Sequence, residues 1–304
     1  MYRPRYAPNR SERQNIIGGI MIAIRGAFEP GRCFLRAASV AISLAFTLSA
    51  TSFCAVSASA APLRLVIHED IGAEGEAQPP ISRYNPLKRS IEAVIGRPVD
   101  VLYTRERPRL LDIVERNQAD VVITHASDIA AKALTGFGYT FIATARPEAS
   151  PIFVGKSAPV ENLTALKGKT IAMPRQELMF GLACSAEMRD FVGTQFSTYA
   201  SREYAAVVWA VENNVHTVGC LPSNARAAEG LEKKGLKIIY AGRPQPTLPV
   251  VASPSLPGAD RAAIAKLLSN MDEADPALKV LGVTSFTEAG EARMRALAGW
   301  LRAK

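Results

Sequence analysis

Short apolar runs alternate with amphipathic stretches along most of the chain. Residues 63–67 predict a strand, and residues 84–95 then repeat apolar positions at helical spacing until Gly96. Residues 120–124 (DVVIT) form a continuous apolar run, which is typical of a strand buried in a parallel sheet. The same reasoning predicts further strands at 99–103, 139–144, 152–155, 169–173, 215–220, 236–241 and 248–252, and helices at 109–117, from Ser127, at 163–167, 178–192, 202–213 and 225–234.

This alternation predicts an α/β fold of two blocks, each a mostly parallel sheet with helices on its faces. The tail, residues 258–304, has a helical pattern throughout. If the tail packs on the first block, the chain crosses between blocks twice, near 145–151 and near 242–249, as in a hinge-bending binding protein. We therefore expect a first lobe from 61–146 and 246–304, a second lobe at 147–245, and a two-strand hinge. Trp209 falls on the apolar side of its predicted helix, so we expect it in the core.

The positive charge of the chain is concentrated at its start. Of the net charge of +8, residues 1–60 contribute +5, with seven arginines and two glutamates, so the remainder carries only +3. A nucleic-acid partner is not expected, because such proteins gather their basic residues on the folded domain.

Residues 1–60 predict a signal peptide. Arg25, Arg32 and Arg36 precede an uncharged apolar stretch, which ends in the small-residue motif at residues 58–60 (ASA). We expect cleavage after Ala60 and hence a periplasmic protein. The long basic region leaves Met1 and Met21 as alternative starts, and an uncleaved membrane anchor is the alternative to cleavage.

Two of the four cysteines, Cys184 and Cys220, lie beyond this segment. In an oxidising compartment they form either a disulfide or two buried thiols, and sequence alone does not decide between these. Three scattered histidines and two cysteines show no metal-ligand spacing, so neither a metal nor another cofactor is expected. Cys184 is the one candidate nucleophile, but it falls inside a predicted helix, and we do not expect an enzyme.

Residues 162–173 (NLTALKGKTIAM) resemble the segment that opens the second lobe of type II periplasmic binding proteins. The phosphate/phosphonate branch of ABC transporter substrate-binding proteins is the most similar, and further segments match in order at 117–124, 137–144, 204–218 and 248–255. The resemblance implies a protein that closes two lobes on a small, anionic solute, of the phosphonate, oxyanion or carboxylate type. It also implies delivery to an ABC permease in the inner membrane, and we expect a monomer. The alternative is a sensory or accessory binding module of the same fold without a transporter.

Three arginines are candidate ligands for that anion. Phosphonate-binding members carry a Ser/Thr-rich loop after the strand that matches 169–173, whereas this chain has Pro174, then Arg175, Gln176 and Glu177. Arg175 can replace the missing hydroxyls with a guanidinium group, while Glu177 favours a cationic group. By alignment, Arg107 and Arg202 fall where the family places an aromatic residue and a histidine. The alternative for each arginine is a solvated surface position.

Other candidates lie on loops that follow predicted strands. Thr124, His125 and Ser127 follow the buried strand 120–124, although Ser127 or Asp128 is equally suited to cap the next helix. Tyr84 is either a ligand contact or the first core residue of its helix, and Asn224 is either a ligand contact or a helix cap.

Overall fold

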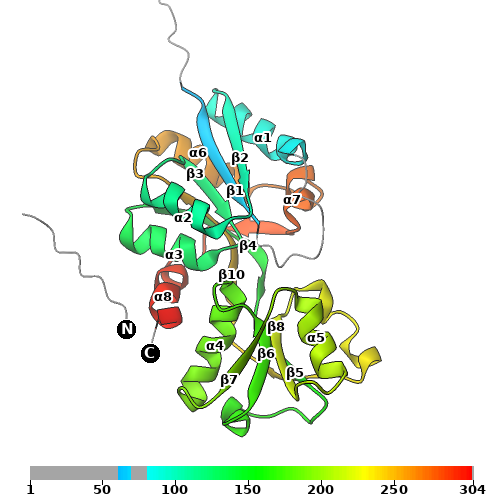
Figure 1. The fold of residues 1–304 in the computed structure, drawn as a ribbon. Helices are drawn as coiled ribbons and strands as arrows, with labels where there is room; N and C mark the ends of the chain where they lie inside the picture. The colour runs from blue at the N-terminus through cyan, green and yellow to red at the C-terminus, as the bar shows by residue number, and fades with distance from the viewer. Residues whose placement is uncertain (1–60, 70–80, 303–304) are drawn as a thin grey trace, which may run out of the picture. The chain divides into compact units, whose positions relative to one another are not determined.

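The computed structural model describes residues 61–69 and 81–302 (Figure 1). The predicted signal peptide, its cleavage site and the two alternative start positions precede or adjoin this part, so they lie outside the described residues, and the anchor alternative does too. These described residues belong to one compact unit. None of the helices in the described part combines the length and apolar character needed to span a bilayer.

The first lobe is built on a six-stranded sheet in the order β11-β4-β10-β3-β1-β2. β1 pairs in parallel with β2 and β3, whereas β10 runs antiparallel to β3 and β4, and β11 antiparallel to β4. Its strands are β1 (Leu63–His68), β2 (Val99–Thr104), β3 (Val121–Thr124), β4 (Thr140–Ala149), β10 (Gln245–Ala252) and β11 (Ser285–Thr287).

Helices cover both faces of this sheet because its strands are apolar on both sides. On β1, Leu63, Leu65 and Ile67 join one buried cluster, and Val66 points into the cluster on the opposite face. The first cluster is closed by α1 (Asn85–Ile95), α6 (Gly258–Ser269) and α7 (Pro276–Leu281), and the second by α2 (Arg107–Glu115), α3 (Ser127–Gly136) and α8 (Glu291–Arg302).

The second lobe is built on a five-stranded sheet in the order β7-β6-β8-β5-β9. β6 is parallel to β7 and β8, and β5 is antiparallel to β8 and β9. Its strands are β5 (Pro151–Gly155), β6 (Thr170–Pro174), β7 (Ser197–Ser201), β8 (Val218–Pro222) and β9 (Lys237–Ala241). α4 (Met179–Val192) packs on one face and α5 (Tyr204–Glu212) on the other, as Figure 1 shows. A short 3₁₀ helix, η2 (Leu163–Leu166), packs beside α4.

The two-lobed α/β fold expected from the sequence is confirmed, but both sheets are mixed rather than mostly parallel. The chain leaves the first sheet at the end of β4, enters the second as β5, and returns from β9 into β10. β5 and β10 therefore join their sheets as antiparallel strands that the strand–helix alternation alone does not reveal.

Several local predictions were wrong. β7 and β11 were missed, because β7 is a polar, mostly exposed edge strand and β11 has only three residues. The helix predicted at 225–234 is two short 3₁₀ turns, η3 (Arg226–Ala228) and η4 (Leu231–Lys234), separated by Gly230 with φ of 65°. Trp209 is 58% exposed and not in the core, since the buried face of α5 is formed by its neighbours Val207, Val208, Ala210 and Val211.

Candidate functional site

A cavity of about 800 Å³ lies where strands of both sheets end. Arg105 follows the last residue of β2, Arg175 the last residue of β6, and Arg202 the last residue of β7, and all three line the cavity. In open α/β sheets ligands bind beyond the carboxyl ends of the strands, so this is the position expected for a binding site. The first-lobe wall consists of residues 105–108, 111, 128, 129 and 132, and the second-lobe wall of residues 175–178, 182 and 202.

Three helices begin at this cavity. Arg107 is the first residue of α2, Asp128 is the second residue of α3, and Leu178 immediately precedes α4. The amino end of a helix carries partial positive charge and unpaired N–H groups, so three of them facing one cavity favour an anion. Side-chain charge acts in the same direction, since the lining holds five arginines and lysines and three carboxylates.

The first-lobe wall contains a buried ion pair. Arg107 donates through Nη2 to Oδ2 of Asp128 at 2.7 Å, and the two side chains are 14% and 6% exposed. The positive charge of Arg107 is therefore partly neutralised by the Asp128 carboxylate. Arg107 does not present its full charge to an incoming anion. The sequence prediction placed Arg107 correctly at the cavity and did not foresee this partner.

The second-lobe wall is more exposed. Arg175 lies 3.4 Å from Glu177, and the two side chains are 39% and 61% exposed. Arg202 is also exposed, and Gln176 approaches the Thr198 hydroxyl at 3.5 Å. The Arg175 main chain is fixed by its N–H, which donates to the Ser201 carbonyl at 3.1 Å. The arginines of this wall thus stand on a fixed backbone with side chains that water can reach.

Gly181 explains how α4 approaches this wall so closely. A Cβ atom at Gly181 would lie 2.0 Å from the Arg175 carbonyl oxygen and 2.7 Å from that of Pro174. Both neighbours are backbone atoms, which cannot turn away as a side chain does. Glycine at this position therefore allows the first turn of α4 to lie directly against the loop that carries Arg175.

Behind the first-lobe wall lies a buried histidine. His68, at the end of β1, has its Nδ1 atom 3.0 Å from the Thr124 hydroxyl, and both side chains are fully buried. Burial, followed by the charges of Arg107 and His125, lowers the pKa of His68 to about 3. His68 is therefore neutral at physiological pH and adds no positive charge to the cavity. Thr124, predicted as a ligand contact, lies at the end of β3 beside this histidine and outside the cavity lining.

The remaining predicted residues lie elsewhere in the fold. Tyr84 is fully buried and donates to Glu69 at 2.7 Å, so it occupies the core position that was its alternative. Burial and this hydrogen bond raise its pKa. Ser127 is buried and donates to the Pro246 carbonyl at 2.8 Å. His125 and Asn224 are exposed and lie outside the cavity lining found in the described part of the chain.

Sequence reasoning missed part of the lining. Asp128 was considered as a helix cap only, and Arg105 and Lys132 were not singled out. The apolar contribution, from Leu111, Ile129, Leu178 and Leu182, was also missed. A signal was present for Lys132, because it lies one helical turn after Asp128 in a helix that starts at a strand end. Nothing in the local pattern marks the leucines as cavity residues rather than core.

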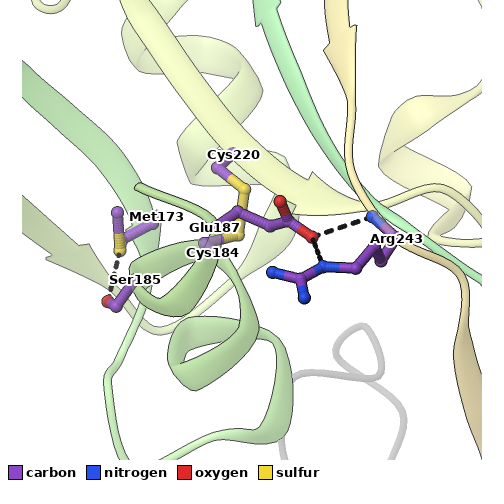
Figure 2. Close-up of a disulfide and its surroundings, with 6 residues drawn as sticks. All are labelled: Met173, Cys184, Ser185, Glu187, Cys220 and Arg243. Atoms are coloured by element: carbon purple, nitrogen blue, oxygen red, sulfur yellow. Dashed lines mark hydrogen bonds and ion pairs between the residues drawn. A yellow bond between two sulfur atoms is a disulfide. The ribbon is translucent and has the colours of Figure 1, made fainter. Parts of the chain in front are cut away.

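In the second lobe, Cys184 of α4 and Cys220 of β8 form a disulfide, with Cα atoms 6.1 Å apart (Figure 2). One turn further along α4, Glu187 accepts hydrogen bonds from the Arg243 main-chain N–H at 2.8 Å and from its Nε at 3.2 Å. Arg243 lies on the return connection between β9 and β10. The disulfide and this ion pair thus fix α4 both to the second sheet and to the connection that leads back to the first. Cys184, the candidate nucleophile, is not a free thiol.

The sequence matches the family described as the periplasmic substrate-binding proteins of phosphonate ABC transporters, over residues 76–293. The chain belongs to this family. No curated protein sequence matches the chain. Membership means that the protein is an extracytoplasmic solute-binding protein that captures a small solute for an ABC importer, as the resemblance of residues 162–173 implied. Members are periplasmic, they work with an ABC permease, and they bind their substrate rather than transform it.

Solved structures support the fold of this phosphonate-binding family member. XAC2383 of Xanthomonas citri, in a structure with bound ATP, has a TM-score of 0.62 at 14% identity and covers 79% of this chain and 97% of its own. PhnD1 of Prochlorococcus marinus, in complex with methylphosphonate, has a TM-score of 0.56 at 13% identity with the same two coverages. The aliphatic sulphonate binding protein SsuA of Escherichia coli has a TM-score of 0.51 at 15% identity and 78% coverage of each chain.

Proposed function

We propose that this protein captures an organic anion in the cavity between its two walls, with Arg175 and Arg202 as the principal anion contacts. The observation that carries the proposal is the meeting of these two arginines with three helix amino ends at the carboxyl ends of the strands. Arg107 is less available because Asp128 holds its charge. Closure of the two lobes would then bury the solute without any chemical step.

The apolar part of the cavity lining restricts the class of solute further. Four leucine and isoleucine side chains share the cavity with the arginines. A bare inorganic ion would leave this surface in contact with water, whereas an organic anion would cover it. The loop at Arg175 has no Ser or Thr from Pro174 to Phe180, so the hydroxyl groups expected of a phosphonate site are replaced here by guanidinium groups. The solute class that fits is an alkylphosphonate, sulfonate or carboxylate.

The solved relatives named above hold anions within the same fold, namely methylphosphonate in PhnD1 and ATP in XAC2383. These ligands differ greatly in size, so the residues of the cavity, rather than the fold, determine which solute binds.

We also propose that residues 1–60 are removed on export by cleavage after Ala60, and that the mature protein acts as a monomer. Because Cys184 is bonded to Cys220, the nucleophile that an enzyme would need is not available there.

The test is a binding screen of the purified protein by thermal shift and calorimetry. The panel contains phosphate, alkylphosphonates, alkylsulfonates and mono- and dicarboxylates, with polyamines as cationic controls. A solute at a hundredfold excess over its dissociation constant stabilises the folded state by about 2.7 kcal/mol. We expect one organic anion class to bind, and we expect R175A and R202A each to weaken binding by about tenfold or more, because each removes a charged hydrogen bond.

R109A is the matched control. Arg109 lies on α2, is exposed, and is outside the cavity lining, so its loss leaves the affinity unchanged. Stabilisation by polyamines alone, or equal losses in R109A and R175A, would contradict an arginine-lined anion site.

A further inference from the structure

Helix α4 has two apolar faces that pack on different lobes. Met188 and Val192 lie in the buried cluster of the second sheet. Ala183 and Ala186 lie in the cluster formed by α3 and α8 of the first lobe. The disulfide through Cys184 binds α4 covalently to the second sheet, so α4 follows the second lobe when the lobes move. The contact between α4 and α8 is therefore the surface along which the two lobes shift.

Arg243 is held on the α4 side of this surface. Glu187 of α4 is 1% exposed and accepts hydrogen bonds from both the main-chain N–H and the Nε of Arg243 (Figure 2). The Nη2 atom of Arg243 also pairs with Asp190, which lies one helical turn further along α4. Charge-assisted hydrogen bonds to a buried carboxylate hold their donor firmly. Arg243 and Asp190 therefore present a fixed charged surface to α8.

The C-terminal helix of the first lobe contacts this charged surface. Trp300 of α8 donates from Nε1 to Oδ2 of Asp190 at 2.9 Å, and the guanidinium carbon of Arg243 lies 4.4 Å from the centre of the Trp300 ring. The next residue, Leu301, accepts through its carbonyl oxygen from Nη2 of Arg189 at 3.0 Å. All these contacts lie near the carboxyl end of α4, whereas the amino end of α4 lies at the cavity. We call Asp190, Arg243 and Trp300 the Trp300 latch.

The latch is closed while the cavity is accessible to water. The side chains of Arg175 and Glu177 on the second-lobe wall are 39% and 61% exposed in this arrangement. The latch itself is weak, because the side chains of Asp190 and Arg243 are 38% and 54% exposed and water can replace their partner. The latch thus favours the solute-free arrangement, and its contacts are weak enough to be released.

We propose that the Trp300 latch holds the lobes apart and so sets the affinity for the solute without touching it. This inference rests on the proposed closure of the lobes over an anion, and it adds a contact that opposes this closure. When the binding-competent form is a minor fraction of the protein, the measured affinity is reduced by that fraction. Loosening the latch therefore raises the affinity.

Calorimetry of W300A and the unaltered protein with methylphosphonate, ethanesulfonate and propionate tests the latch. We expect the dissociation constant of the bound anion to fall by about tenfold in W300A, the size expected for one charged hydrogen bond with a cation–π contact. W300F keeps a ring but lacks the N–H group, so it should give a smaller gain, and it replaces W300A if that variant fails to fold. W209F is the matched control, since Trp209 is 58% exposed on α5, and it should bind as the unaltered protein does.

A gain in affinity separates a latch from a purely structural role, since loss of packing alone does not tighten binding. Unchanged or weaker binding in a folded W300A or W300F protein overturns the proposal. W209F also leaves Trp300 as the only tryptophan of the chain, so its fluorescence should change over the same solute concentrations as the heat of binding. Binding without this change contradicts release of the latch.

Failure of the anion site gives a different result. If none of the three anions binds, the proposed function is wrong, and small-angle scattering of the solute-free proteins then decides the latch. A smaller radius of gyration for W300A than for W209F supports a contact that holds the lobes apart, and equal radii overturn it.

Discussion

The two walls of the cavity carry the same type of charge pair in different surroundings. On the first-lobe wall, Arg107 and Asp128 lie 2.7 Å apart with side chains 14% and 6% exposed. On the second-lobe wall, Arg175 and Glu177 lie 3.4 Å apart with side chains 39% and 61% exposed. Opposite charges attract strongly where water is excluded and weakly where it is not. The Arg107–Asp128 pair is therefore held in place, whereas Arg175 can leave Glu177 for another anionic partner.

This difference assigns the two walls separate tasks. A wall whose charges are locked in place is suited to select the shape and polarity of a solute, because it cannot adapt to a wrong one. A wall whose arginines are solvated can release a weak partner, Glu177, and take up the anionic group of the solute. The sequence places an arginine next to a strand end on both walls, and only burial separates their roles.

The largest effect is expected from breaking the buried pair. R107A would leave Asp128 charged and buried without its partner, and we expect a loss of about 3 to 5 kcal/mol in the free energy of unfolding, the range for one-sided removal of a buried ion pair. Chemical denaturation of the solute-free protein measures it. R109A, an exposed arginine on the same helix, is the control and should change the stability by less than about 0.5 kcal/mol.

The double variant R107A/D128A separates the cost of leaving a buried charge unpaired from the cost of losing side-chain packing. Because it removes both charges, we expect it to be more stable than R107A alone. A cost below about 1 kcal/mol for R107A would show that the first-lobe wall is as loosely held as the second.

An intermediate effect on the free energy of unfolding is expected when the pH is lowered, because of His68, which lies behind the first-lobe wall. The pKa of His68 is about 3 in the folded protein against an ordinary value of 6.5, chiefly because of burial. Between these two pKa values, His68 is protonated in the unfolded chain and neutral in the folded protein. The contribution of neutral His68 to the free energy of unfolding is therefore complete above about pH 6.5 and is lost as the pH falls toward about 3. Between pH 7 and pH 5 we expect about 2 kcal/mol of stability to be lost.

Denaturation curves at pH 7, 6 and 5 measure this slope, and H68N should remove most of it. H216N is the control, since His216 lies in the second lobe, where its ring contacts that of Tyr199 at a tilt of 39° with ring centres 4.6 Å apart. An equal change of slope in both variants would assign the acid sensitivity to something other than the burial of His68.

The sequence predicted those parts of the molecule that local pattern determines. The apolar residues of β1 and the helical spacing of α1 are properties of adjacent residues, so both elements were located to within one residue of their bounds. The arginines at the cavity were also found, because the end of a strand is itself a local feature. β7 was not found, since its five mostly exposed residues are a strand only through pairing with β6.

Tertiary pairing also explains why some predicted site residues lie outside the cavity lining. Tyr84 is buried in the apolar cluster of the first lobe and its hydroxyl donates to Glu69, and the Ser127 hydroxyl donates to the carbonyl of Pro246 on the return strand. The partnership of Arg107 with Asp128 joins the first turns of two different helices, α2 and α3. None of these contacts can be predicted from the neighbouring sequence. Charge and residue type alone therefore suggested three equivalent anion-binding arginines, whereas in the fold they differ in burial and in their partners.

The smallest effect on stability is expected from the exposed pair. R175A removes the contact with Glu177, which in exposed surroundings contributes little, so we expect the free energy of unfolding to change by less than about 0.5 kcal/mol. The loop keeps its position through the main-chain bond from Arg175 to Ser201 and the close approach of Gly181, and neither depends on the arginine side chain. A stable R175A protein that has lost its solute would assign the loss to a missing contact. An R175A protein that unfolds as readily as R107A would instead place both arginines in the structural framework, and the two walls would no longer differ.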